Sequence, residues 1–325
     1  MKILVTGAAG LLGSHIVREL IANQHHPVCL VRKSTDTSTL AGLDLTYVYG
    51  SIEYKSDVEA AVSGCEAIIH AAAIFAHPQN DQKAFEQINV QGSRNLAEAA
   101  IESGIRKFIY ISTANTIGTG SKSSPSTEVD PFNSKELESH YLNTKLKAEE
   151  FLLEQVRKDR LEAVIINPSF MIGPYDSKPS SGRMIMYGVK SPLLVVPPGG
   201  KNFVHVRDVA RVAVKALVKG KSGEKYLVTG ENYSYAEFFK LLQSETAQRK
   251  LMIQVPKNLF YGAAHIVETL KGKKAEFNVS NAKVLGRDNY YSGKKAQKTF
   301  AYKPTPVNQA IQEALNWFRQ NGKLT

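Results

Sequence analysis

The chain has 325 residues, 43% of them hydrophobic, and a formal net charge of +11. This length allows one or two domains with a sizeable core. No apolar run approaches the roughly 18 residues that a membrane span requires. Thirteen Lys or Arg but only four Asp or Glu fall within residues 250–325, dispersed and without an arginine-rich or aromatic motif. This distribution favours a solvated face, or a lobe facing an anionic ligand, over a nucleic acid-binding surface.

The start of the chain and its two cysteines bear on location. The first strand-like run begins at residue 2, which leaves no room for a signal peptide. Cys29 and Cys65 lie in apolar contexts, which are typical of buried free thiols rather than of a disulfide. We therefore expect a cytoplasmic protein that binds neither a membrane nor nucleic acid.

A strand-to-helix turn opens the chain. Residues 3–5 are apolar and predict a buried strand, and the apolar spacing over 11–23 predicts a helix. Between them, TGAAGLLG places Gly7 for a tight turn, Gly10 where a ligand could approach the backbone, and Gly13 where helix and strand pack closely. The free N–H groups and the dipole at the helix start favour a phosphate at this turn.

Strand-like and helical segments then alternate along the first half. The strand-like runs are residues 28–31, 45–48, 67–69, 107–111 and 163–166. The helical stretches are residues 57–62, 83–103 and 138–158. This alternation predicts an α/β fold, with a Rossmann-type doubly wound parallel sheet covered by helices on both faces.

The second half adds a smaller lobe to this sheet. Loops rich in Gly, Pro and Ser are expected at 118–133, 173–182 and 197–202, and connections of such length usually carry function. A helix at 207–218 and a strand at 226–228 return to the sheet layer, and the remainder reads as helices with short loops. The predicted domains are a dinucleotide-binding domain, 1–168 with 204–230, and a mostly helical substrate-binding lobe, 169–203 with 231–325.

Two further segments carry candidate chemistry. Tyr141 and Lys145 form a Y-x-x-x-K pair on one helix face, so a phenol and an ammonium can point to one place. A neighbouring ammonium favours the phenolate, which brings proton exchange within reach at neutral pH. Ser112 and Thr113 end a buried strand at the carboxyl edge, where ligands sit in open parallel sheets.

In their shared order these segments resemble the short-chain dehydrogenase/reductase superfamily, specifically its extended branch, the NAD-dependent epimerase/dehydratase superfamily. The resemblance covers nearly the whole chain. The matching segments are residues 6–13, 69–73, 89–95, Thr113 five residues before Gly118, 167–169, Gly173-Pro174 and 203–210. The end of the second strand at Arg32, the step at 166–168 and residues 302–318 look most like dihydroflavonol-4-reductase-like proteins.

The resemblance implies catalytic roles position by position. Tyr141 would exchange the proton, and Lys145 would hold the nicotinamide ribose hydroxyls and lower the pKa of Tyr141. Thr113 would orient the carbonyl or alcohol, with Ser112 as the alternative. Asn89 would support its helix rather than act directly.

His205 and Asp208 lie in a matched segment of the family pattern as well. Packing and an N-cap are the roles expected for them, rather than a part in the reaction. The resemblance implies no metal site.

Cofactor choice is predicted from the end of the second strand. An acid at this place would bind the ribose 2′-hydroxyl of NAD, but Arg32-Lys33-Ser34 stands there and favours the 2′-phosphate of NADP. Ser51 stands where many family members place an adenine-contacting Asp. The residues expected to bind NADP are Gly7, Gly10, Leu11, Leu12, Gly13, Arg32, Lys33, Ser51, Ile52, Ala71, Ala72, Ala73, Tyr141, Lys145, Pro168 and Ser169.

The leading functional hypothesis is an NADP-dependent oxidoreductase that reduces an aldehyde or ketone to an alcohol, with Tyr141 as proton donor. A nucleotide-sugar epimerase is the first alternative, weakened because the second lobe is rich in lysine and poor in arginine. A catalytically idle NADP sensor is the second, disfavoured by the intact Thr113, Tyr141 and Lys145. The resemblance also argues against sugar dehydration, since dehydratases of the family typically have an acid after the catalytic Thr, and Ala114-Asn115 supplies none after Thr113.

A homodimer is expected from the helix at 138–158. Its apolar positions exceed the single stripe needed to face one sheet, and in extended family members this helix pairs with the preceding long helix across a two-fold axis. The competing interpretation is that the substrate lobe folds over this stripe. The apolar positions are Leu142, Leu146, Phe151, Leu152, Leu153 and Val156.

Overall fold

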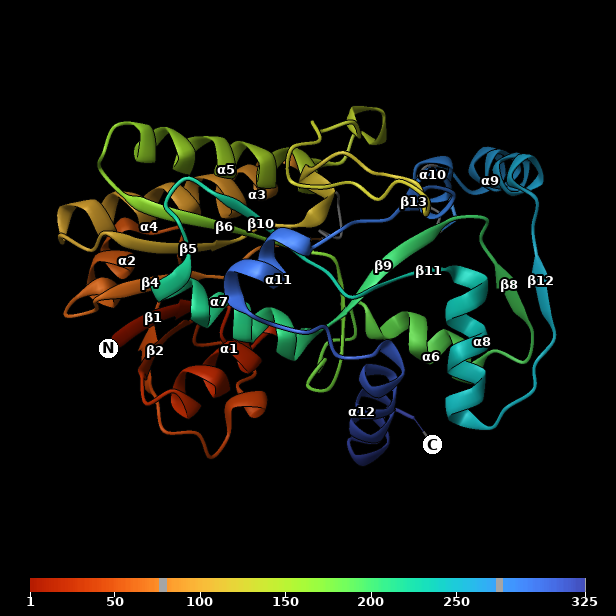
Figure 1. Cartoon of the computed structure of the whole chain (residues 1–325), viewed down its shortest axis with the longest axis horizontal. Helices are drawn as coiled ribbons and strands as arrows, with labels where there is room; N and C mark the ends of the chain where they lie inside the picture. The colour runs from red at the N-terminus through yellow and green to blue at the C-terminus, as the bar shows by residue number, and fades with distance from the viewer. Residues whose placement is uncertain (76–80, 273–276, 325) are drawn as a thin grey trace.

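The computed structural model describes residues 1–75, 81–272 and 277–324 (Figure 1). Its main sheet has seven parallel strands in the order β10-β6-β5-β4-β1-β2-β3. The strands are β1 (Lys2–Thr6), β2 (His26–Val31), β3 (Thr46–Tyr49), β4 (Ala67–His70), β5 (Lys107–Ile111), β6 (Glu162–Pro168) and β10 (Lys225–Val228). This confirms the predicted doubly wound parallel sheet.

Both faces of the sheet are covered by helices (Figure 1). Ile3 and Val5 belong to the core under one layer, and Leu4 belongs to the core under the other, as alternation along a strand requires. The first layer contains α1 (Leu11–Ala22), α7 (Val206–Lys219) and α11 (Lys294–Phe300). The second contains α2 (Lys55–Val62), α4 (Gly92–Glu102) and α5 (His140–Arg157).

The helix predicted over 83–103 is interrupted by a wider turn. The chain runs from α3 (Gln82–Phe85) through a π-helical turn, η2 (Glu86–Gln91), into α4. Asn89 lies inside this turn, and its buried side chain bonds to the backbone N–H and carbonyl of Ile74 and to Thr144. These contacts fix the segment after β4 against α5, which agrees with a supporting position for Asn89.

The lobe carries helices and short strands. Its helices are α6 (Gly182–Lys190), α8 (Tyr235–Thr246), α9 (Lys257–Lys271), α10 (Val279–Leu285) and α12 (Val307–Gln320). Its strands are β7 (Phe170–Ile172), β8 (Leu194–Val196), β9 (Gly200–His205), β11 (Glu231–Ser234), β12 (Met252–Gln254) and β13 (Asp288–Asn289). Single 3₁₀ turns, η1 (Ser38–Leu40), η3 (Ala114–Thr116) and η4 (Lys135–Leu137), occur in connections.

Two sequence expectations for the lobe are wrong in detail. The loop expected at 197–202 gives way to β9 at Gly200, and the all-helical interpretation of the chain after residue 230 misses β11, β12 and β13. These strands have two to four residues. That is too short for a period of two to show in the sequence. The boundaries of the two predicted domains stay a prediction.

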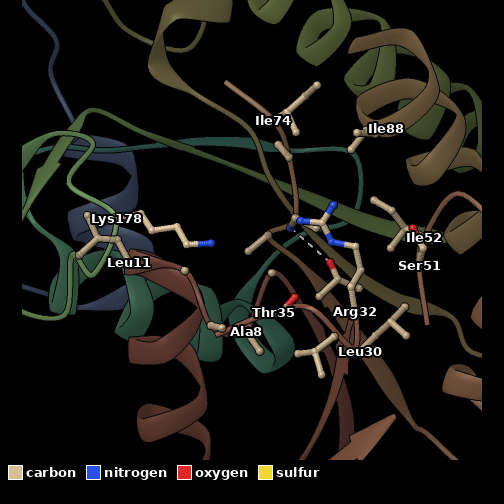
Figure 2. Close-up of a pocket in the computed structure, with 18 of the residues that line it drawn as sticks. Ala8, Leu11, Leu30, Arg32, Thr35, Ser51, Ile52, Ile74, Ile88 and Lys178 are labelled. Atoms are coloured by element: carbon tan, nitrogen blue, oxygen red, sulfur yellow. Dashed lines mark hydrogen bonds between the residues drawn. The ribbon is translucent and has the colours of Figure 1, made fainter. Parts of the chain in front are cut away.

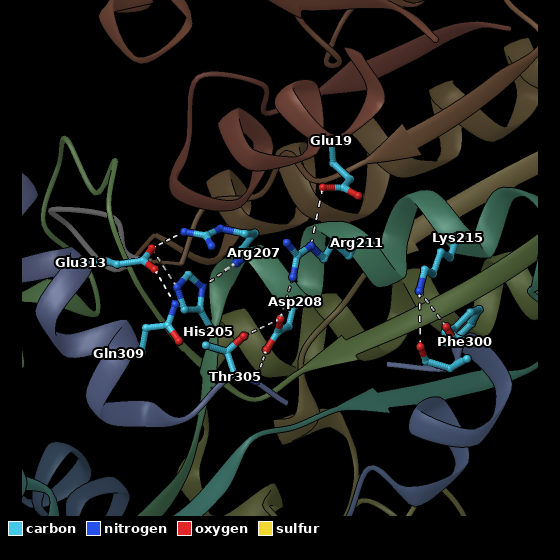
Figure 3. Close-up of polar contacts among 11 residues, drawn as sticks. Glu19, His205, Arg207, Asp208, Arg211, Lys215, Phe300, Thr305, Gln309 and Glu313 are labelled. Atoms are coloured by element: carbon cyan, nitrogen blue, oxygen red, sulfur yellow. Dashed lines mark hydrogen bonds and ion pairs between the residues drawn. The ribbon is translucent and has the colours of Figure 1, made fainter. Parts of the chain in front are cut away.

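The start of α7 is tied to the C-terminal segment (Figure 3). His205 caps α7, since its Nδ1 accepts from the Arg207 N–H at 3.0 Å, and its Nε2 lies 3.1 Å from Glu313. The Asp208 carboxylate lies in the first turn and accepts from the Thr305 N–H and hydroxyl, at 2.7 and 3.0 Å. The N-cap is therefore His205, whereas Asp208 anchors the chain that leads into α12.

Two simpler expectations can be compared with the structure. Cys29 and Cys65 are both buried free thiols, as predicted. Within the described residues, no helix has the length and apolar character needed to cross a bilayer.

Candidate active site

The glycine turn after β1 has the geometry that its spacing predicts. Gly7 has a φ of +70°, and a Cβ there would lie 2.7 Å from the Ala72 nitrogen. A Cβ on Gly13 would lie 2.0 Å from the Gly7 carbonyl oxygen, so α1 could not approach the turn. A Cβ on Gly10 would meet only that same oxygen, at 3.2 Å. Gly10 therefore leaves the backbone at the start of α1 open to a ligand.

A groove crosses the carboxyl ends of the strands where β1 and β4 lie side by side. The chain order reverses at this point, since β2 and β3 extend one way and β5 and β6 the other. Two adjoining cavities of about 460 Å³ each make up the groove. The outer cavity extends from the glycine turn toward Arg32, and the inner cavity extends toward Tyr141. Both are lined by Gly7, Gly10, Leu11, Ala71, Ala73, Phe75 and Ser180.

Nearly every residue predicted to bind a cofactor lines this groove. Arg32, Ser51, Ile52 and Ala72 line the outer cavity, and Leu12, Gly13, Tyr141, Lys145, Pro168 and Ser169 line the inner cavity. Lys33 is the exception, since it is exposed and lines neither cavity. β2 ends at Val31, and the Thr35 N–H donates to the Arg32 carbonyl at 2.8 Å, so Lys33 lies inside a tight turn rather than on the strand.

The outer cavity also contains side chains that the sequence analysis missed (Figure 2). Lys178 extends into it from the loop before α6, facing Arg32 and Thr35. Asp36 lines it as well, four residues beyond Arg32. Hydrogen bonds from Ser38 hold the pKa of Asp36 below its usual value, and Lys178 lowers it further. The sequence analysis singled out the long loop at 173–182, which contains Lys178. It had no motif that would have identified Lys178 itself.

The inner cavity brings the three predicted catalytic residues together. Thr113, Tyr141 and Lys145 all line it, from the end of β5 and from α5. The Lys145 ammonium is buried, donates to the Ile111 carbonyl at 2.6 Å and lies 4.1 Å from the centroid of the Tyr110 ring. The Ser112 hydroxyl is buried in the same cavity, without a hydrogen-bond partner among the residues that the structure describes.

Burial dominates the electrostatics of this cavity. It raises the pKa of Tyr141 to about 12, and a hydrogen bond with Thr113 opposes the rise. It lowers the pKa of Lys145 to about 7, and the charge of Glu149 opposes the fall. The phenol is therefore held in its protonated form, ready to donate a proton. The lowering of the Tyr141 pKa by Lys145, expected from the resemblance, stays a prediction.

A buried carboxylate below the site went unnoticed in the sequence. Glu149 has no exposed surface, accepts from the Thr116 hydroxyl at 2.6 Å and from Asn167 Nδ2 at 2.9 Å, and pairs with Lys225. Asn167 also donates to the Thr113 carbonyl at 3.1 Å. This network joins β6, α5 and the turn that carries Thr113. Glu149 lies four residues beyond Lys145 on α5, so helical spacing from the Y-x-x-x-K pair could have revealed it.

Comparison with known proteins places this chain in a family. Residues 3–229 match the model of the NAD dependent epimerase/dehydratase family, and the chain belongs to that family. Sterol demethylase protein B of Methylococcus capsulatus is 29% identical, over 100% of both chains. Cinnamoyl-CoA reductase 1 of Oryza sativa is 25% identical, over 99% of this chain and 91% of the relative. These findings confirm the family resemblance read from the sequence.

A solved structure supports the same placement. The crystal structure of gox2253 is 33% identical, covers 99% of both chains and superposes with a TM-score of 0.87. The similarity therefore spans the lobe as well as the sheet. Relatives in this family include reductases, which makes this chain similar to oxidoreductases of the extended branch.

Proposed function

We propose that this protein is an NADP-dependent carbonyl reductase that converts an aldehyde or ketone to an alcohol. One observation carries the proposal: Thr113, Tyr141 and Lys145 converge on an inner cavity that continues along a glycine-lined groove to Arg32. Relatives named as reductases, such as cinnamoyl-CoA reductase 1, support the same reaction class.

The groove fits a dinucleotide along its whole length. The open backbone at Gly10 and the start of α1 would receive the diphosphate. Arg32 and Lys178 would face the 2′-phosphate, which a planar guanidinium can bind with two hydrogen bonds. Lys145 would hold the nicotinamide ribose at the inner end. When bound there, NADPH supplies a hydride.

The side chains of the inner cavity would handle the carbonyl oxygen. Thr113 would donate a hydrogen bond to that oxygen and orient it toward the phenol. Tyr141 Oη would give its proton to that oxygen as negative charge develops there. The raised pKa of Tyr141 keeps the phenol protonated before the reaction, and a Lys145 ammonium beside it would ease release of that proton. The Glu149 network would keep Thr113 in place through Asn167.

The experiment is turnover of NADPH against a panel of aldehydes and ketones. We expect NADPH oxidation in step with alcohol formation for some members, and loss of both in Tyr141→Phe. Interconversion of a nucleotide sugar without net cofactor consumption would instead establish an epimerase, an activity that the family description names. Tight NADPH binding with no turnover of either substrate type would establish a sensor.

We also propose that the protein is a cytoplasmic homodimer that pairs through α5. Leu142 and Leu152 are buried within the chain, so the dimer would rest on the half-buried apolar positions Leu146, Phe151, Leu153 and Val156. Phe151 lines a groove between η2, α4 and α5, 5.1 Å from the Arg94 guanidinium, and a second copy would face this groove. Light scattering that returns the 35.8 kDa mass of one chain at micromolar concentration would overturn this.

A further inference from the structure

We propose that Lys201 is an anion-binding subsite for the substrate, and that preferred substrates are aldehydes or ketones that also bear a compact anionic group such as a carboxylate. This inference rests on the proposed reductase function and deepens it by naming a substrate class. The inference comes from the distribution of charged side chains around the inner cavity.

Lys201 lies on the substrate side of the phenol. It belongs to β9, where it pairs with Tyr233 of β11 and Asn289 of β13. It lines the inner cavity and also a smaller adjoining cavity of about 140 Å³. Tyr141, Asn115 and Asn289 line both cavities too. A molecule that reaches the Tyr141 phenol from the smaller cavity therefore passes Lys201.

The Lys201 ammonium has no polar protein partner among the residues that the structure describes. Its one recorded contact is with the face of Phe170, 5.1 Å from the ring centroid. Two neighbouring cations are occupied: Lys145 donates to Ile111, and Arg287 pairs with Glu136 and bonds to Thr119. Lys201 is thus a cation held in a cleft without a counter-charge.

The cavity also lacks acidic side chains. In the described parts of the chain, its lining includes Lys145, Arg183 and Lys201 but neither Asp nor Glu. Burial lowers the pKa of Lys201 to about 8, which shows how poorly the cleft solvates its charge. Taking a cation from water without a partner is costly, and an anionic ligand would offset that cost. The fold therefore holds Lys201 in a state that a substrate anion stabilises.

The form of this subsite favours a compact anion over a nucleotide diphosphate. Lysine offers a single point charge, whereas diphosphates are commonly held by arginine forks. Arg287 lies beside the smaller cavity, but its guanidinium is already bound by Glu136 and Thr119. Arg183 of α6 lines the inner cavity but not the outer one, and among the described residues it is the one arginine in the inner lining.

The test compares para-substituted benzaldehydes, of which one carries a negative charge and two are neutral. The value of kcat/KM with NADPH is measured for para-carboxybenzaldehyde, its methyl ester and para-methylbenzaldehyde. We expect the wild-type protein to prefer the carboxylate by about 10-fold or more, the size of a charged hydrogen bond. Lys201→Met should bring that ratio close to one. Lys240→Met, which removes an exposed lysine of α8, is the matched control and should keep the preference.

A binding measurement tests the anion-binding role of Lys201 independently of reductase activity. Calorimetry with para-(hydroxymethyl)benzoate and oxidised NADP is run on the same three proteins. Binding that Lys201→Met abolishes and Lys240→Met retains supports the subsite even if no aldehyde is reduced. Equal kcat/KM for charged and neutral aldehydes, a preference that survives in Lys201→Met, or benzoate binding that does not depend on Lys201 would each overturn the inference.

Discussion

The outer and inner cavities are built in different ways. The outer cavity is lined mostly by residues that follow β1, β2, β3 and β4, four neighbouring strands within the first 75 residues. The inner cavity takes side chains from segments as far apart as Gly7 and Tyr291, and so depends on how the lobe is seated against the sheet. Local turn geometry therefore creates the part suited to the cofactor, whereas tertiary packing creates the part that selects the substrate.

The largest expected effect concerns the inner cavity. Tyr141→Phe removes only the phenol oxygen, so the cavity keeps its shape and NADPH affinity should hardly change. Turnover should fall about 10²–10⁴-fold, because the proton donor is lost. Tyr187→Phe is the control, since that hydroxyl bonds to Val195 far from the groove. Ordinary turnover by Tyr141→Phe on a good substrate would remove Tyr141 from the mechanism.

The next effect belongs to the outer cavity. Arg32→Ala should weaken NADPH binding by about 1.5–3 kcal/mol while leaving NADH binding nearly unchanged, because only NADPH carries the 2′-phosphate. Lys33→Ala should change the NADPH to NADH ratio much less, since Lys33 lines neither cavity. Dissociation constants from fluorescence titration give the comparison. Equal affinities of the unmutated protein for both cofactors would refute the NADP assignment.

Substitutions at two glycines of the same turn should distinguish an effect on stability from an effect on NADPH binding. Gly13→Ala should lower stability by about 1–3 kcal/mol, because the new Cβ would overlap the Gly7 carbonyl oxygen. Gly10→Ala should leave the melting temperature nearly unchanged yet weaken NADPH binding, since its Cβ faces the groove. Thermal melts and cofactor titrations on both variants provide the measurement. Similar melting losses in both would contradict these different positions.

The smallest expected effect concerns the contact between His15 and the loop at 173–182, which contributes residues to both cavities. His15 Nε2 bonds to the Pro174 carbonyl at 3.1 Å, and burial lowers the pKa of His15 to about 4. Below pH ~6.5 the unfolded chain binds a proton there that the folded chain does not. Stability should therefore fall as the pH drops from ~6.5 toward ~4, by about 1 kcal/mol at pH ~5.5.

Substituting His15 separates its contribution to the pH dependence of stability from the contributions of other histidines. His15→Gln should flatten the decline in unfolding free energy across that pH range, whereas His265→Gln, which changes an exposed residue of α9, should not. Denaturant titrations at several pH values measure the slope. An unaltered slope in His15→Gln would show that His15 is not held neutral by the fold.

The features that could be predicted from the sequence are those that lie within one short segment of the chain. The turn at Gly7, Gly10 and Gly13 and the pair Tyr141 and Lys145 were predictable, because each lies within one short segment whose spacing fixes its geometry. The structure brings these segments to one groove as expected. Lys33 lines neither cavity because it lies in the turn after β2, and its contact with the cofactor stays a prediction.

The residues that the sequence did not reveal lie mostly in the lobe. Lys178 and Lys201 come from loops and short strands without a motif, and only the seating of the lobe brings them to the groove. Asn289 sits on a two-residue strand that no periodicity could predict. Glu149 differs, because it shares a helix with Lys145 and was within reach of helical spacing.

The central claim is that NADPH and Tyr141 together reduce a carbonyl compound. Its most direct test uses NADPH that carries deuterium at the transferable position, with the aldehydes of the panel. The account predicts an alcohol with deuterium on its carbinol carbon, formed by the wild-type protein and nearly absent with Tyr141→Phe. Failure to find deuterium in any alcohol, or equal labelling by the two proteins, would contradict it.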